Sequence, residues 1–381
     1  MTYPEATVRG GLRPTRIEVD LGVIQRNVAR LRDVAGTDVC AVVKADGYGH
    51  GALRVADACL AGGATWLAVA LVEEGLVLRD GGIDAPILVL SEPPVAALPA
   101  LLAENLTPTV YRLPFLAALD GAGHERGRPV GVHFKVDTGM GRVGVPPADW
   151  YERLEQVAIA RGVEVEGLYT HLARADEPAV STTDEQLAAF DKVVDRAAKL
   201  GIRPRWIHAA NTAGTLVHPA SRYTLVRPGI GVYGLSPGPA VVAADHGLEP
   251  AMRLATEVAF AKRVPAGTPV SYGHRWRAPG DGWLATLPIG YADGLPRALT
   301  NRIQVLLDGR RRPLVGTVTM DQVLVWCGDD EPDVGDPAVL IGTQADEHVR
   351  MEEWAAAADT ITYEIVTQLS ARLPRHHRVP Q

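Results

Sequence analysis

Eight short apolar segments recur within residues 14–245, and segments with helical spacing lie between most of them. The apolar segments lie at residues 39–43, 66–70, 86–90, 108–111, 130–135, 164–169, 206–209 and 223–227. Continuous apolar runs of this length are typical of strands that are buried on both faces, as in a parallel sheet. After Asp20, the residues Leu21, Ile24, Val28 and Leu31 recur at helical spacing. Eight strands that alternate with helices predict a (β/α)8 barrel, and a doubly wound open sheet is the alternative.

The pattern changes after residue 245 to alternating segments with hairpin signals and few long helical stretches. The run Arg310-Arg311-Arg312 follows Asp308-Gly309, which is typical of a hairpin turn with solvated side chains. We therefore expect an α/β fold, with an N-terminal (β/α)8 barrel over residues 14–245 and a mostly β C-terminal domain over residues 246–381. Residues 1–13 form an N-terminal extension, and a closing helix is expected near residues 362–372.

Composition excludes several classes of function. The formal net charge is -7, so the basic face that nucleic acids require is not expected. The three cysteines, Cys40, Cys59 and Cys327, form neither a disulfide framework nor a CxxC metal motif, which suits a reducing cytosol. The N-terminal residues lack an apolar signal-peptide core, and no run of 18 apolar residues predicts a membrane span. We expect a cytoplasmic protein with a small-molecule substrate.

Unusual polar residues follow the ends of five predicted strands. Chemistry in a (β/α)8 barrel takes place at the C-terminal ends of the strands. The residues found there are Lys44, Lys135 with Arg142 shortly after it, Tyr169 and His171, Asn211 and Thr212, and Arg227. Their equivalent positions predict that they converge on one rim of the barrel.

A glycine-rich segment follows the last predicted barrel strand. Gly229, Gly231 and Gly234 match the spacing of a dinucleotide-binding loop, but the prolines that follow do not open a helix. We favour a phosphate held by backbone N–H groups. A lysine beside a phosphate site suggests a Schiff-base cofactor such as pyridoxal 5'-phosphate, and an aldolase acting on phosphorylated sugars fits the same spacing.

The chain resembles the alanine racemase family, a group of fold-type III pyridoxal-phosphate enzymes, along nearly its whole length. The resemblance is carried, in family order, by the segments AVVKADGYGHGA, KVDTGMGRVG, THLARADE, AANTAG, RPGIGVYG, VSYGHRW, PIGYADG, VTMDQ and ITYEIVTQLSARLPR. It implies racemisation of L-alanine and D-alanine, which usually supplies D-alanine to peptidoglycan. It also implies a homodimer in which each active site lies between one barrel and the partner's β domain.

Residue roles also follow from the resemblance. The catalytic bases would be Lys44, which binds the cofactor as a Schiff base, and Tyr272 from the partner subunit. Arg227 would face the pyridine nitrogen, and His171 would hydrogen-bond both Tyr272 and Arg227. The other cofactor-binding residues would be Tyr48, Asn211, Thr212, Gly229, Ile230 and Tyr363. The substrate carboxylate would bind Arg142 and the backbone N–H of Met320. The supporting residues would be Asp321, Tyr291 at the entry path, and Lys135, which is N-carboxylated in several relatives and would steady Arg142. No metal is implied.

Four positions depart from the family pattern. Asp46 and Gly47 stand where Asn and Ala are common, Thr317 replaces an Arg, and Thr319 stands where Cys or Ser is frequent. Tyr363 and Tyr291 should leave room for little beyond a methyl side chain, although a pocket rejects the extra hydroxyl of serine only weakly. The alternatives are therefore a serine or broad-specificity racemase, a decarboxylase on the same scaffold, or a non-catalytic pyridoxal-phosphate carrier.

Overall fold

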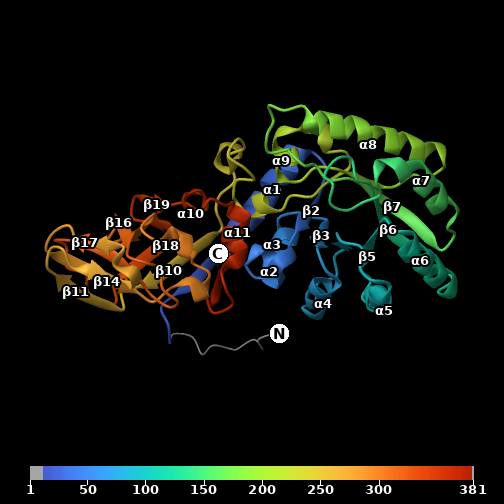
Figure 1. Ribbon diagram of the computed structural model, residues 1–381. Coiled ribbons are helices and arrows are strands. Elements are labelled where there is room, and N and C mark those ends of the chain that lie inside the picture. The colour runs from blue at the N-terminus through green and yellow to red at the C-terminus, as the bar shows by residue number, and fades with distance from the viewer. Residues whose placement is uncertain (1–11, 380–381) are drawn as a thin grey trace. The chain divides into compact units, whose positions relative to one another are not determined.

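The structure, a computed structural model, describes residues 12–379 and divides them into two compact units (Figure 1). The barrel unit spans residues 22–250, and the β unit combines residues 12–21 with residues 251–379. None of the helices formed by residues 12–379 has the length and apolar character needed to cross a bilayer.

All eight predicted strands are present in the barrel unit, and they form one parallel sheet. The strands are β2 (Asp38–Val42), β3 (Trp66–Val69), β4 (Ile87–Val89), β5 (Thr107–Val110), β6 (Val130–Lys135), β7 (Val163–Tyr169), β8 (Trp206–His208) and β9 (Leu225–Val226). They pair in the order β8-β7-β6-β5-β4-β3-β2-β9. The ring is nearly closed between β8 and β9, where the N–H of Thr224 donates to the carbonyl of Ile207 at 3.1 Å. The barrel prediction is confirmed, because an open sheet would leave these two edge strands apart.

Helices alternate with these strands and lie outside them, as α4, α6 and α8 show in Figure 1. The helices are α1 (Leu21–Ala35), α2 (Lys44–Tyr48), α3 (Ala52–Ala61), α4 (Val72–Asp80), α5 (Leu98–Ala103), α6 (Leu113–Glu125), α7 (Trp150–Ile159), α8 (Thr182–Lys199) and α9 (Thr212–Val217). In α1, the apolar residues predicted to face the core, Leu21, Ile24, Val28 and Leu31, are all buried.

The β unit is built on a ten-stranded sheet with the order β11-β14-β17-β16-β15-β18-β10-β1-β20, where β19 pairs with β18. Its strands are β1 (Arg16–Asp20), β10 (Met252–Glu257), β11 (Phe260–Val264), β14 (Gly282–Leu287), β15 (Gln304–Leu307), β16 (Arg310–Val315), β17 (Val323–Gly328), β18 (Pro337–Gln344), β19 (Glu347–Val349) and β20 (Arg375–Arg378). A separate hairpin joins β12 (Pro269–Val270) to β13 (Trp276–Arg277). Two helices, α10 (Met351–Ala358) and α11 (Thr362–Gln368), precede the last strand, and α11 lies where the closing helix was predicted.

The N-terminal boundary of the barrel differs from the predicted one. Residues 14–21 were assigned to the barrel, but β1 pairs antiparallel with β10 and parallel with β20 in the β unit. The buried carboxylate of Glu18 fixes this arrangement by forming ion pairs with Arg16, Arg253 and Arg378 at 2.9, 3.0 and 2.6 Å. Of the predicted extension 1–13, residues 1–11 lie outside the described residues.

Candidate active site

The barrel unit brings the predicted rim residues together at the C-terminal ends of its strands. Lys44 lies just after β2, Lys135 ends β6, and Arg227 follows β9 directly. Burial, and then nearby positive charge, holds the pKa of the His171 imidazole well below its ordinary value. The charges that act on it are those of Arg227, Lys135, Arg142 and Lys44. His171 is therefore neutral, and the rim is strongly cationic.

Lys44 stands at the start of a left-handed turn. Ala45, Asp46, Gly47 and Tyr48 all have positive φ angles, between 51° and 60°. Outside glycine, this conformation costs about 1 kcal/mol per residue, so neighbouring groups must hold it. The carboxylate of Glu74 accepts a hydrogen bond from the N–H of Ala45 at 2.7 Å. The turn directs Lys44 into the rim, where burial, and then the charge of Arg142, lowers the pKa of its amine against the opposing charge of Glu74.

The structure gives Asp46 a local role. Its carboxylate accepts a hydrogen bond at 2.8 Å from the N–H of Ala52, the first residue of α3. Helix N-termini leave N–H groups unpaired and favour negative charge. Asp46 therefore ties the left-handed turn after Lys44 to the following helix.

A small cradle lies where β8 and β9 lead into short helices. The hydroxyl of Thr212 accepts hydrogen bonds from the N–H groups of Gly229 and Gly231 at 3.0 and 3.1 Å. A Cβ on Gly229 would lie 2.5 Å from the hydroxyl oxygen of Tyr48, so only glycine fits between this ring and the loop. Ile230 begins a 3-10 turn in the same loop, and Asn211 caps α9 by accepting from the N–H of Gly214 at 2.9 Å. The hydroxyls of Thr212 and Tyr48 lie beside the start of α9 and a glycine-rich backbone segment, and this combination suits a phosphate group.

Arg227 is fixed by acceptors on the neighbouring strands. Its guanidinium donates to His208 Nδ1 at 2.6 Å, to the carbonyl of Thr170 at 2.8 Å and to the carbonyl of Ala209 at 3.2 Å. His171 Nδ1 lies 3.4 Å from the same guanidinium, and the ring of Tyr169 lies below it with its centroid at 4.9 Å. Arg227 is buried, and these acceptors hold its two terminal nitrogens in place.

Two histidines continue this network into the barrel. A guanidinium can only donate, so His208 Nδ1 accepts, and its Nε2 carries a proton that it donates to His133 Nδ1 at 2.9 Å. Burial, followed by the charge of Arg227, lowers the pKa of His133 to about 3 and keeps His208 neutral as well. Our sequence analysis missed both histidines. The sequence did contain a signal for His133, because residues two apart on a strand share a face and His133 therefore lies on the same face as Lys135.

Lys135 is buried and has its amine 5.2 Å from the centroid of the Tyr169 ring. Burial first, and then the charges of Arg227, Arg142 and Lys44, lower the pKa of this amine to about 7, although Asp137 opposes the shift. The carboxylate of Asp137 accepts from the N–H groups of Gly139 and Gly141, which shapes the loop that leads to Arg142.

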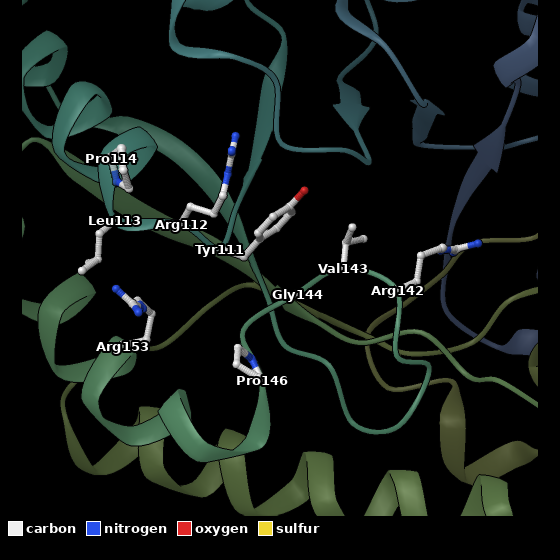
Figure 2. Close-up of a pocket in the computed structure, with 9 residues that line it drawn as sticks. All are labelled: Tyr111, Arg112, Leu113, Pro114, Arg142, Val143, Gly144, Pro146 and Arg153. Carbon is white, nitrogen blue, oxygen red and sulfur yellow. The ribbon is translucent and has the colours of Figure 1, made fainter.

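Arg142 borders an open depression of about 560 Å³ that is also lined by Tyr111, Arg112 and Arg153. In Figure 2 the side chain of Arg142 extends away from Arg112 and Arg153. Arg112 is held by an ion pair with Glu92 at 2.6 Å. Arg112 and Arg142 are both exposed, but among residues 12–379 Arg142 forms no ion pair, so its guanidinium stays available to a ligand.

The remaining predicted residues lie on the β unit. Tyr272 and Met320 expose 73% and 52% of their surface. The N–H of Tyr291 donates to the carbonyl of Thr319 at 2.9 Å, so the loops that carry Tyr291 and Met320 are bonded together. Asp321 forms an ion pair with Arg372 at 2.8 Å. Tyr363 lies half-buried in the first turn of α11, where its carbonyl accepts from Thr367. These residues are on a different unit from Lys44 and Arg227.

Among residues 12–379, no group of three or more His, Cys, Asp and Glu side chains could hold a metal ion. Cys40, Cys59 and Cys327 are buried free thiols.

Comparisons with known proteins agree over the whole chain. The family model for the N-terminal domain of alanine racemase matches residues 19–237, and the model for the C-terminal domain matches residues 251–377. An alanine racemase from Symbiobacterium thermophilum is 47% identical over 369 residues, which cover 96% of this chain and 98% of that protein.

Solved structures agree as well. The crystal structure of the alanine racemase from D-cycloserine-producing Streptomyces lavendulae aligns with a TM-score of 0.92 at 38% identity, and covers 97% of this chain and 98% of that one. The alanine racemase of Bartonella henselae, whose structure has covalently bound pyridoxal phosphate, aligns with a TM-score of 0.86 at 28% identity, over 96% of this chain and 99% of that one.

Proposed function

Because this chain belongs to the alanine racemase family, we propose that it interconverts L-alanine and D-alanine with pyridoxal 5'-phosphate as its cofactor. The observation that carries the proposal is the rim of the barrel unit. There a half-buried lysine with a lowered pKa, a cradle formed by the Thr212 hydroxyl and a glycine-rich loop, and a buried arginine held by neighbouring acceptors lie at the ends of neighbouring strands.

The residues of the rim fit pyridoxal phosphate. Lys44 would bind the aldehyde carbon, and the cradle of Thr212, Tyr48, Gly229 and Ile230 would hold the phosphate, with Asn211 fixing the helix start behind it. Tyr363 would add a further hydroxyl from the β unit. The cofactor supplies an electron sink for the pair of electrons that remains when the Cα–H bond of alanine breaks.

Racemisation requires a proton to leave one face of Cα and another to arrive at the opposite face. One base on a fixed arm reaches both faces poorly, whereas two bases on opposite sides reach both. We assign Lys44 Nζ to the proton of D-alanine and the hydroxyl of Tyr272 to the proton of L-alanine. The lowered pKa of Lys44 supports its role, because a smaller fraction of the amine is protonated at neutral pH. His171 would hydrogen-bond the Tyr272 hydroxyl and favour its deprotonated form.

Arg227 would face the pyridine nitrogen with a hydrogen bond. A guanidinium cannot give up its proton, so Arg227 would leave the nitrogen unprotonated. Arg227 would thereby limit how far the electron pair is drawn away from Cα and would favour rapid return of a proton to Cα. The neutral state of His208 supports this role, because a neutral imidazole can accept from Arg227 whereas an imidazolium cannot.

The carboxylate of alanine would bind Arg142 and the backbone N–H of Met320. An N-carboxylated Lys135 would steady Arg142, with Asp321 supporting the Met320 loop through Arg372. Tyr291 and Tyr363 would narrow the pocket to a methyl side chain. In this arrangement alanine is the preferred substrate, and serine reacts more slowly.

We further propose a homodimer in which the β unit of one subunit completes the site on the barrel unit of the other. The large exposed fractions of Tyr272 and Met320 support this, because both would otherwise be left in solvent. The proposed role is the supply of D-alanine for peptidoglycan in the cytoplasm, a setting that three unpaired cysteines suit.

A complementation experiment tests the shared site. The variants Lys44→Ala and Tyr272→Phe should each lose nearly all racemisation, and Tyr272→Phe should keep its cofactor. After the two proteins are mixed and their subunits exchange, mixed dimers should regain up to one intact site each. Subunit exchange without any regained activity would refute the shared site, and full activity of Tyr272→Phe would refute the assignment of the second base.

A further inference from the structure

We propose that Ser271 and Thr317 form a two-way clamp that positions Tyr272 for proton transfer. Both are positioning residues in this account, because they act on the substrate only through Tyr272. The inference rests on the proposed function, in which Tyr272 is the second base.

The side chain of Tyr272 has little packing to orient it. The residue is 73% exposed, and no group among residues 12–379 hydrogen-bonds its hydroxyl. Within its own chain, the position of the phenol therefore depends on the backbone of Ser271 and of the 3-10 turn Tyr272–His274, which leads from β12 to β13.

That backbone adopts a conformation that its sequence does not favour. Ser271 has φ 60° and ψ -176°, a region populated almost entirely by glycine, and His274 has φ 46°. Gly273, with φ 72°, is the only residue of the turn for which a positive φ is easy. A non-glycine residue remains in such a region only when surrounding contacts determine its conformation.

Two hydrogen bonds supply those contacts. The hydroxyl of Ser271 donates to the carbonyl of Thr317 at 2.7 Å, and the hydroxyl of Thr317 donates to the carbonyl of Tyr272 at 2.7 Å. Thr317 is only 4% exposed, so little water competes for these bonds. The two segments approach so closely that a Cβ on Gly316 would lie 2.8 Å from the Cβ of Ser271. The clamp therefore needs glycine at position 316 and hydroxyls at positions 271 and 317.

The clamp also joins Tyr272 to the carboxylate-binding loop. Thr317 lies three residues before Met320, and the carbonyls of Thr319 and Met320 accept from the N–H groups of Tyr291 and Ala292 at 2.9 and 3.0 Å. The group that moves the proton and the N–H proposed to hold the substrate carboxylate are thus fixed to one framework. Thr317, which departs from the family pattern, gains a specific function through this bond.

Loss of the clamp should misplace Tyr272 without unfolding the β unit. Displacement of a reacting group by about 1 Å can reduce a rate roughly a hundredfold. Thr317→Val removes the hydroxyl and keeps the shape of the side chain, and Thr317→Ser restores the hydroxyl. Thr268→Val is the control, because the hydroxyl of Thr268 makes an exposed bond of the same 2.7 Å length to the carbonyl of Pro265 in the adjoining turn, and this bond does not involve Tyr272.

The test follows the fate of D-alanine carrying deuterium at Cα in ordinary water, with the cofactor-loaded enzyme. Lys44 can replace this deuterium with a solvent proton on the same face, whereas formation of L-alanine needs Tyr272. We expect Thr317→Val to raise the ratio of exchange to inversion about tenfold or more. Thr317→Ser and Thr268→Val should keep the ratio of the parent enzyme. A purely structural effect would lower both rates together and leave the ratio unchanged.

Substitutions of Ser271 separate the hydrogen bond from the backbone conformation. Ser271→Ala loses the bond and still carries a Cβ that disfavours positive φ, whereas Ser271→Gly loses the bond but holds the conformation without strain. We expect inversion to be fastest in the parent enzyme, slower in Ser271→Gly and slowest in Ser271→Ala. Equal rates for Ala and Gly would show that the clamp does not hold the turn.

A spectroscopic readout needs no catalysis. In protein labelled with 3-fluorotyrosine, the fluorine resonance of Tyr272 is identified by its loss in Tyr272→Phe. Thr317→Val should shift or broaden this resonance, and Thr317→Ser should restore it. The clamp is refuted if Tyr272→Phe abolishes inversion while Thr317→Val leaves both the ratio and the resonance unchanged. Inversion that survives Tyr272→Phe would refute the proposed function instead.

Discussion

Lys135 should react with carbon dioxide at neutral pH. Only the uncharged amine attacks carbon dioxide, which forms an N–C bond, releases a proton and leaves an anionic carbamate. With its pKa lowered to about 7, roughly half of the Lys135 amines are uncharged at pH 7. At the ordinary value of 10.5 the fraction would be roughly one in three thousand. The lowered pKa thus increases the fraction of uncharged Lys135 amine at pH 7 about a thousandfold.

The surroundings of Lys135 also favour the product. Arg227 and Arg142 are the two largest charges acting on Lys135, and both disfavour its protonated amine. The same two charges attract a carbamate. Modification therefore replaces the repulsion between the protonated amine and the two arginines with attraction between the carbamate and the arginines. A carbamate beside Arg142 would hold this exposed guanidinium in one position for the substrate carboxylate.

Carbon NMR of the holoenzyme in 13C-labelled bicarbonate tests this prediction. We expect one carbamate resonance that weakens as the pH falls below 7 and is absent from Lys135→Met. The control variant Lys192→Ala, which changes an exposed lysine, should keep the resonance. Removal of carbon dioxide should raise the KM for alanine several-fold, reversibly. Absence of the resonance at saturating bicarbonate between pH 7 and pH 8.5 would refute the reasoning.

Three further predictions concern single side chains. Glu18→Gln should lower the free energy of unfolding by about 2 kcal/mol at pH 7, because the buried carboxylate holds three arginines. Burial raises the pKa of Glu18, but Arg253, Arg378 and Arg16 together outweigh burial and lower this pKa below its ordinary value. The stabilisation by Glu18 is therefore present above the ordinary pKa and is lost as pH falls through the lowered one. Denaturant unfolding at several pH values should show this difference shrinking in acid, and a constant difference would contradict it. Asp46→Ala should cost about 1 kcal/mol by removing the bond to Ala52, whereas Asp46→Asn, which keeps the acceptor, should cost less than half as much by the same assay. His208→Phe keeps the stacking on Tyr169 but removes the acceptor of Arg227. The kcat for alanine should therefore fall about tenfold with little change in cofactor affinity. An unchanged kcat would show that Arg227 does not need the His208 acceptor.

The barrel could be predicted from the sequence because its strands are continuous apolar runs between helices, and the polar residues at their ends stand out against them. The boundary of the barrel could not be predicted in the same way. Residues 14–21, which were assigned to the barrel, contain β1 (Arg16–Asp20), and only the distant segments that contain β10 and β20 decide which sheet β1 joins. Pairing between segments so far apart in the sequence leaves no local pattern.

The sequence indicated the polar residues at the strand ends as the candidate site, but it did not indicate the neighbouring residues that hold them in place. His133 and His208 lie in strands, where a single histidine is usually interpreted as part of the core. Their tautomers can be assigned only from the bond between His208 and Arg227. The left-handed turn after Lys44 contains Ala45 and Asp46, which do not favour positive φ. Thr317 could be recognised as a departure from the family pattern, but its bond to Tyr272 depends on tertiary structure.

The central claim is that this chain racemises alanine, and a chiral assay in heavy water tests it most directly. The purified holoenzyme is incubated with L-alanine, and separately with L-serine, while both enantiomers and the deuterium at Cα are followed. The account predicts D-alanine carrying deuterium, an approach to equal amounts of the two enantiomers, and much slower conversion of serine. A cofactor-loaded protein that leaves alanine unchanged, in configuration and in isotope, would contradict it.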